Sequence, residues 1–248
     1  MNPLYLEGKT GMRVALDQPA LSVVTPEKTR QLFPLTRISR VVVSGSVEWS
    51  MPALFACADA GISIVFLNQS GVVRCQWVGA SPKNSSIVPL FSELLLRQDA
   101  LQRYQNWSVA MQRMSARSSA RRIGFSEWQE VDVKVLDEWV QQSLNESWLP
   151  IKFQLKGYLL SSVLQYLGDL GFDSKCDFLV DGQFSLADEL TKLLLWDFYP
   201  SLLLWCQRSS QVPEQELVVK FYQQRYQRVE HLLRGLLNKL HQCLREGV

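Results

Sequence analysis

The hydrophobic pattern divides the chain into two parts that differ in period. Over residues 1–79, short stretches of alternating apolar and polar residues, and β-branched runs such as Val41–Val43, lie between glycine and proline turns. From residue 87 onward, apolar residues recur at intervals of three and four, which is the helical period. We therefore expect an α+β protein in which a small, mainly β N-terminal domain with one helix (1–79) is joined by a linker (80–86) to an all-α C-terminal domain (87–248).

The most regular part of the first domain runs from residue 38 to residue 79. Ser50 is suited to cap a helix whose first turn holds Pro52, and Gly61 is suited to end it. Asn68–Gly71 is a turn signal between two apolar strands. The expected strands are 4–7, 12–16, 21–24, 41–43, 62–67 and 72–77, and residues 25–28 and 33–35 are expected connections.

The second domain contains a series of apolar segments with helical spacing. Gly171 is expected to end one helix, and Pro200 is expected to break a very apolar helix, or to separate a pair of helices. The expected helical segments are 87–103, 104–123, 131–144, 150–170, 184–206 and 214–246, with a loop over 173–183.

Composition adds little to this picture. A net charge of +2 selects no partner class, so any nucleic-acid surface must come from local clustering. The five cysteines have no paired spacing, and most lie in apolar runs, which favours buried free thiols in a reducing compartment. The N-terminus lacks the apolar core of a signal peptide, and Asp197 and Pro200 interrupt the most apolar run. We expect a cytoplasmic protein without a membrane segment.

Common catalytic motifs are missing from the sequence. It contains no phosphate-binding glycine loop, no nucleophile elbow and only two histidines, His231 and His241. Both histidines lie in the last predicted helix, about 15 Å apart along its axis. They are too far apart to share a metal within one chain.

An arginine-rich helix is the first candidate for a functional surface. Arg113, Arg117 and Arg121 recur every four residues and so share one helix face, with Arg103 further up and Arg122 beside the face. No acidic residue occurs between Asp99 and Glu127. A solvated helix face would explain the pattern, but arginine forks without compensating acids favour contact with nucleic-acid phosphates.

Acidic residues form a second group, and two of them lie together on a predicted helix. Asp188 and Glu189 could supply one or two ligands to a divalent cation, whereas a solvated loop or capping role suits most of the others. The aromatic residues nearby have helical apolar spacing and are expected in the core rather than as base-stacking platforms; they are Tyr158, Tyr166, Trp196, Phe198, Tyr199 and Trp205.

Two long stretches resemble a known family. LYLEGKTGMRVAL, followed by PLTRISRVVVSGSVEWSMPALFACADAGISIVFLNQSGVVRCQWVG, resembles the N-terminal domain of the CRISPR-associated spacer-acquisition integrase (Cas-one, or Cas1). GYLLSSVLQYLGDLGFD, FLV and SLADEL resemble, more weakly, the helical active-site region of the family. The resemblance implies a metal-dependent DNA nuclease and integrase that acts as a homodimer, with a Cas-two-like (Cas2) partner and with Mg²⁺ or Mn²⁺ as the cofactor.

The family holds its metal with a glutamate, a histidine and an aspartate in the helical domain. By resemblance these positions correspond to Ser162, Val180 and Glu189, with Asp188 beside the last. Serine and valine side chains cannot replace a carboxylate and an imidazole as metal ligands. The resemblance therefore implies a diverged metal site, in which one retained carboxylate would hold a divalent cation weakly.

Three hypotheses follow. The favoured one is a Cas1-like, DNA-binding homodimer of spacer acquisition with impaired or absent nuclease and integrase activity, which binds double-stranded or branched DNA through Arg103, Arg113, Arg117, Arg121 and Arg122. The second is an active endonuclease or integrase with a carboxylate site rebuilt around Asp188 and Glu189. The third is a protein-interaction subunit that does not bind DNA.

Overall fold

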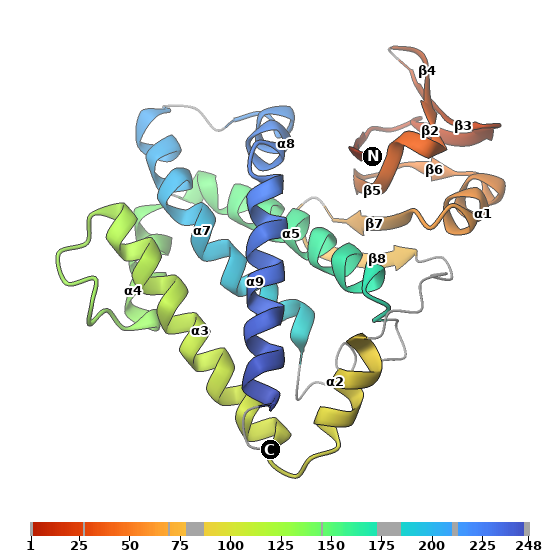
Figure 1. Cartoon of the computed structure of the whole chain (residues 1–248). Helices are drawn as coiled ribbons and strands as arrows, with labels where there is room; N and C mark the ends of the chain where they lie inside the picture. The colour runs from red at the N-terminus through yellow and green to blue at the C-terminus, as the bar shows by residue number, and fades with distance from the viewer. Residues whose placement is uncertain are drawn as a thin grey trace. The chain divides into compact units, whose positions relative to one another are not determined.

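The computed structural model describes residues 2–26, 28–68, 70–77, 87–144, 146–172, 185–209 and 213–245. The chain divides into two compact units, residues 1–83 and 84–248 (Figure 1). The first contains all the strands described and the second contains helices, so the expected α+β class is confirmed. The expected linker, 80–86, lies outside the described residues.

The N-terminal unit contains two four-stranded sheets. The chain leaves the first sheet after β5, forms the helix α1 (Met51–Asp59) and returns as β7, and this crossover makes β5 and β7 parallel. The first sheet has the order β1 (Asn2–Gly8), β5 (Ile38–Gly45), β7 (Ser63–Leu67), β8 (Val73–Trp77), and the second has the order β4 (Lys28–Pro34), β3 (Ala20–Thr25), β2 (Arg13–Asp17), β6 (Glu48–Trp49).

Helix α1 begins and ends as the sequence predicts. The Ser50 side chain accepts a hydrogen bond from the Ala53 amide at 3.3 Å. Gly61 follows the helix with a φ of 68°, a left-handed conformation that glycine adopts without a steric cost. Ala53 and Cys57 are fully buried in the core of this unit, where burial raises the pKa of the Cys57 thiol to about 11.

Two expectations for the N-terminal unit were wrong. Residues 33–34, expected in a connection, belong to the strand β4, which pairs with β3 in an antiparallel hairpin. This strand is mostly exposed, with Leu32 54% exposed, so it lacks the buried alternation that marks a strand. Among the described cysteines Cys57 is buried but Cys75 is exposed, because Cys75 lies on the strand β8 at the edge of its sheet.

The helical unit is built around α7 (Leu186–Arg208), which packs against α3 (Ala100–Ile123), α4 (Val133–Ser143), α5 (Leu149–Asp169) and α9 (Tyr226–Arg245) (Figure 1). Buried side chains lie on all sides of α7, as expected for a central helix. The remaining helical elements are α2 (Ile87–Leu95), the 3₁₀ turn η2 (Glu146–Trp148) and α8 (Gln215–Gln223). Across the described residues, no helix is both long and apolar enough to span a bilayer.

Three helix boundaries differ from the prediction. Residues 100–103, expected in the segment 87–103, belong to α3 instead, because α2 ends at Leu95. Helix α7 continues through Pro200, because Tyr199 and Leu202 are buried on either side of it and packing holds the helix together. The predicted helix 214–246 is instead two helices, which divide at Gln224 and Arg225. This division lets α8 pack on α5 while α9 packs on α3 and α7.

Candidate functional site

Ser162, the position matched to the family's glutamate, lies in the interior of the helical unit. Its side chain is 3% exposed, and its hydroxyl donates to the Tyr158 carbonyl at 3.1 Å. The Tyr222 hydroxyl of α8 is hydrogen-bonded to Ser162 Oγ. The Tyr222 ring in turn stacks on Phe198 of α7, with centroids 5.8 Å apart. A neutral, buried hydroxyl that is already hydrogen-bonded supplies neither the charge nor the open coordination position that a divalent cation requires.

Glu189, the position matched to the aspartate, keeps its carboxylate, which binds two neutral side chains and one lysine. Its Oε1 accepts from the Ser108 hydroxyl at 2.7 Å and from the Gln112 amide at 2.8 Å, both on α3. Gln112 is itself oriented by the Trp196 indole N–H, which donates to it at 2.9 Å. Asp188, one residue earlier, is exposed at the surface. The Glu189 carboxylate therefore joins α7 to α3 through hydrogen bonds.

A pocket lined by α3, α4, α5 and α7 surrounds Glu189 with lysines. The Lys192 ammonium lies 3.8 Å from Glu189 Oε2. Ammonium groups here repel a divalent cation, whereas they attract phosphate oxygens. The sequence carries no signal of this cluster, because its members come from separate helices. The lysines lining the pocket are Lys134, Lys152, Lys156 and Lys192.

Asp137 on α4 occupies the same pocket and is also engaged. Its Oδ1 accepts from the Tyr199 hydroxyl at 3.0 Å and lies 3.5 Å from the Lys152 ammonium. Burial, together with the Asp137 charge and hydrogen bond, raises the pKa of Tyr199 well above its usual range. Tyr199 is therefore a neutral hydrogen-bond donor at physiological pH, and its ring packs in the interior as the sequence predicts.

The described residues do not fit a divalent metal. Nowhere in the described ranges do three histidine, cysteine, aspartate or glutamate side chains converge. Val180, together with Asp173, Asp177 and Asp181, lies outside the described residues. Ser162 is buried and already hydrogen-bonded, and Glu189 faces lysines, so the two matched positions that the structure describes do not form a common carboxylate site.

Three of the five candidate arginines form a solvent-facing surface, which we call the arginine face (Arg113, Arg117 and Arg121 of α3). All three are exposed, as their spacing predicts. The Arg121 guanidinium lies over the Trp128 ring, 5.4 Å from its centroid. In the part of the chain that the structure describes, no carboxylate pairs with Arg113 or Arg117. Their charge faces solvent.

The other two candidates are already engaged. Arg103 binds Asp99 in the preceding turn and donates to the Cys243 carbonyl of α9 at 3.4 Å. Arg122 lies 2.6 Å from Asp197 Oδ1, and Arg228 of α9 binds the same carboxylate through two contacts of 2.8 Å. These contacts stabilise the packing of α3, α7 and α9, so Arg103 and Arg122 are weaker candidates for phosphate binding.

Asp197 is held charged within this arrangement. Burial alone would raise the pKa of its carboxyl, but the hydrogen bonds and charges of Arg228 and Arg122 outweigh burial and lower it. The absence of acids between Asp99 and Glu127 is thus partly offset by an acid from another helix. The spacing of residues within α3 could not predict this contact, because Asp197 lies on α7.

Comparisons with known proteins agree with the fold and with the sequence resemblance. The family model described as CRISPR associated protein Cas1 matches residues 4–123, just under half of the chain. A comparison with curated proteins gives no match.

Three solved structures show the same fold along nearly the whole chain. A Cas1 protein from Thermotoga maritima is 15% identical with a TM-score of 0.66, and the alignment covers 99% of this chain and 97% of that one. TtCas1 in a complex with DNA is 14% identical with a TM-score of 0.57, covering 98% and 92%. A Cas6-RT-Cas1–Cas2 complex is 13% identical with a TM-score of 0.63, covering 98% of this chain and 36% of that one. The chain therefore matches the Cas1 family in sequence over residues 4–123 and has the fold of Cas1 proteins along nearly its whole length.

Proposed function

We propose that this Cas1-like chain is a DNA-binding protein of CRISPR spacer acquisition whose metal-dependent nuclease and integrase chemistry is lost or strongly impaired. One observation carries the proposal: in a Cas1-like fold, the position matched to a metal-binding glutamate is a buried serine whose hydroxyl is hydrogen-bonded to Tyr222 and Tyr158. The family resemblance supports the role, and a DNA complex among the structural neighbours supports the ligand.

The arginine face is the proposed phosphate-contacting surface. Arg113, Arg117 and Arg121 present three guanidinium groups along one exposed side of α3. Guanidinium groups bind phosphate oxygens through paired hydrogen bonds and are always charged. Because such contacts release counterions from the DNA, they make affinity strongly dependent on salt.

The lysines around Glu189 are a second proposed phosphate surface. The pocket presents ammonium groups of three helices, at the position where a family member would hold a cation. We infer that charge on the protein replaces part of the charge of a metal in attracting the DNA backbone, without the ability of a metal to orient the reacting oxygens.

A titration of DNA binding against salt tests the arginine face. Fluorescence anisotropy of a branched and a linear duplex is measured for the protein and for the triple variant Arg113→Ala, Arg117→Ala, Arg121→Ala. We expect the slope of log K against log salt to become shallower by about 0.9 for each phosphate that the variant no longer neutralises. The matched control changes exposed arginines on other helices to alanine: Arg208, Arg234 and Arg245. An unchanged slope in the arginine-face variant would exclude this surface from the DNA site.

Calorimetry with Mn²⁺ tests the loss of chemistry. We expect the wild-type protein to bind Mn²⁺ no more tightly than the Glu189→Ala variant does. We also expect no Mn²⁺-dependent cleavage of branched DNA. Tight binding that disappears in Glu189→Ala would contradict the proposal and establish a rebuilt carboxylate site.

We propose further that the protein acts as a homodimer with a Cas2-like partner in the cytoplasm. The family resemblance supports the dimer, and the Cas1–Cas2 complex among the structural neighbours supports the partner. Light scattering of the purified chain, alone and mixed with a Cas2 protein, measures both associations. A monomer that forms no complex would contradict both.

A further inference from the structure

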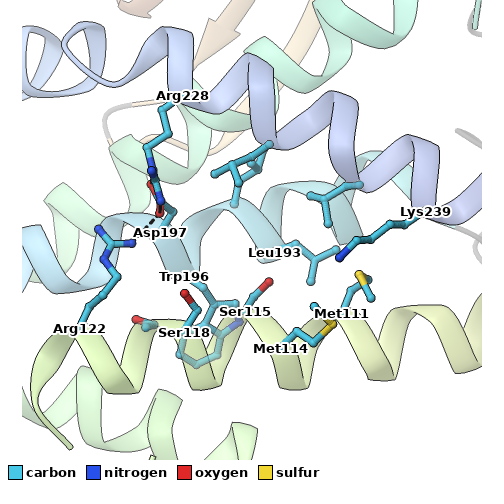
Figure 2. A pocket seen from close by; sticks show the side chains of 14 residues that line it. Met111, Met114, Ser115, Ser118, Arg122, Leu193, Trp196, Asp197, Arg228 and Lys239 are labelled. Atoms are coloured by element: carbon cyan, nitrogen blue, oxygen red, sulfur yellow. Dashed lines mark hydrogen bonds and ion pairs between the residues drawn. The ribbon is translucent and has the colours of Figure 1, made fainter.

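A groove between α3 and α9, floored by α7, has no part in the proposed DNA site. Figure 2 shows the side chains that line it. Its lining is mainly apolar, with serines along the α3 side; the apolar side chains that define this α3–α9 groove are Met111, Met114, Leu193, Trp196, Leu232 and Leu236. Met114 is 52% exposed and Leu232 and Leu236 are half-buried, whereas Leu193 and Trp196 of the floor are buried. The apolar surface that a ligand can reach therefore lies mainly on the two walls.

The two walls of the groove run in opposite directions. At one end Arg103 of α3 donates to the Cys243 carbonyl near the end of α9. At the other end Arg122, near the end of α3, shares Asp197 with Arg228 near the start of α9. The groove lies between these two sets of contacts. Its length can be taken from the residues of α9 that line it. Arg228 and Lys239 are eleven residues apart, which is about 16 Å along a helix.

The charge of the groove is concentrated at its two ends. Arg122 and Arg228 lie at one end and Lys239 at the other, as Figure 2 shows. Among the described lining residues the one carboxylate is Asp197, and two guanidinium groups already share it. The Arg228 side chain remains 57% exposed despite this contact. Positive charge therefore exceeds negative charge at each end of an apolar floor.

These features fit one kind of ligand. Methionine and leucine side chains adapt to an apolar helix face, and a groove of this length accommodates about three helical turns. Acidic groups on the ligand would meet Arg228 at one end and Lys239 at the other. We propose that the α3–α9 groove binds an amphipathic helix of a partner protein, with its apolar side in the groove and acidic residues about three turns apart.

This surface is distinct from the arginine face, although both involve α3. At about 100° per residue, Met114, Ser118 and Arg122 lie roughly a third of a turn around the helix from the arginine face. A substitution can therefore alter one surface and leave the other unchanged. The proposal does not depend on DNA binding.

The test uses a labelled synthetic peptide of about five helical turns, with leucines at every third and fourth position and two glutamates eleven positions apart. A second peptide carries lysines in place of the glutamates. We expect the wild-type protein to bind the glutamate peptide about tenfold or more tightly than the lysine peptide. In Lys239→Glu the preference should shrink or reverse, whereas Arg234→Glu, an exposed change on α9 outside the groove, should preserve it.

The apolar floor is tested separately. Met114→Glu should abolish peptide binding, and Leu217→Glu, a similarly exposed apolar site on α8 outside the groove, should not. The triple arginine-face variant should keep the preference for the glutamate peptide, so failure of the peptide test and failure of the DNA test are distinguishable. Equal binding of the two peptides, or unchanged binding in Met114→Glu, would overturn the proposal. Conversion of a dimer to a monomer by Met114→Glu would also overturn it, because the groove would then join two copies of this chain.

Discussion

Ser162 and Glu189 correspond by resemblance to two ligands of one metal site, yet they have diverged in different ways. Ser162 lies in a neutral part of the interior, next to Tyr222. Its hydroxyl is hydrogen-bonded to the Tyr158 carbonyl and to the Tyr222 hydroxyl. Around Glu189 the charge remains, but Ser108, Gln112 and a set of lysines surround it. The first position has become part of the hydrophobic core, and the second has become part of a polar pocket. Restoring or removing a carboxylate should therefore have different effects at the two positions.

The largest expected effect comes from restoring the carboxylate at Ser162. Ser162→Glu places a larger, charged group at a buried position whose hydrogen-bond partners are the Tyr158 carbonyl and the Tyr222 hydroxyl, both neutral. We expect a loss of about 3–5 kcal/mol in the free energy of unfolding, measured by urea denaturation. Ser162→Ala, which removes the hydroxyl without adding charge, should cost about 1 kcal/mol. A stable Ser162→Glu protein that binds Mn²⁺ would show that the site lacks a single ligand rather than its whole environment.

The next largest effect on stability is expected at Asp197. Unlike Glu189, this carboxylate of α7 is paired with two arginines. Asp197→Asn should lower the free energy of unfolding by about 2 kcal/mol at neutral pH, because two arginines lose a charged partner. The folded-state pKa of Asp197 is lowered, so its stabilisation is present above the unfolded pKa and is lost as pH falls through the folded value. Wild type and variant should therefore converge in acid.

The matched control for this pH dependence is Asp188→Asn, a carboxylate on the same helix for which the structure shows no ion pair among the described residues. We expect its unfolding free energy to follow the wild type at every pH. A difference between wild type and Asp197→Asn that persists undiminished to the lowest pH would contradict the ion-pair explanation.

A smaller effect is expected from Glu189→Ala. The variant loses the two hydrogen bonds from Ser108 and Gln112, which should cost about 1–2 kcal/mol in urea denaturation. Heat released by Mn²⁺ addition should not change. If instead the stability is unchanged and Mn²⁺ binding is lost, Glu189 is a metal ligand and the comparison with Ser162 fails.

The smallest effect on stability is expected from Lys134→Ala together with Lys156→Ala. In the described structure neither ammonium group is joined to a carboxylate, so the unfolding free energy should change by less than about 0.5 kcal/mol. The salt slope of DNA binding should nevertheless become shallower, by about 0.9 for each phosphate that these lysines neutralise in the wild type. An unchanged slope would remove the lysine pocket from the proposed DNA surface.

Much of the fold could be predicted from local signals. The cap at Ser50, the stop at Gly61 and the helix starting near Pro150 are confirmed, because capping and turn chemistry depend on neighbouring residues. The exposed positions of Arg113, Arg117 and Arg121 are also confirmed, since a four-residue spacing fixes a helix face. Predictions failed where packing outweighed local preference, as at Pro200 inside α7 and at the division between α8 and α9.

The sequence by itself therefore determined the two-part α+β organisation, the arginine face and the absence of a carboxylate at Ser162. Only the tertiary structure decided which charges are already paired. Arg122 meets Asp197 across 75 positions of sequence, and the lysines around Glu189 come from three helices. The physical reason is that helical periodicity specifies which side chains share a face, whereas the partner of that face depends on how separate helices pack around α7.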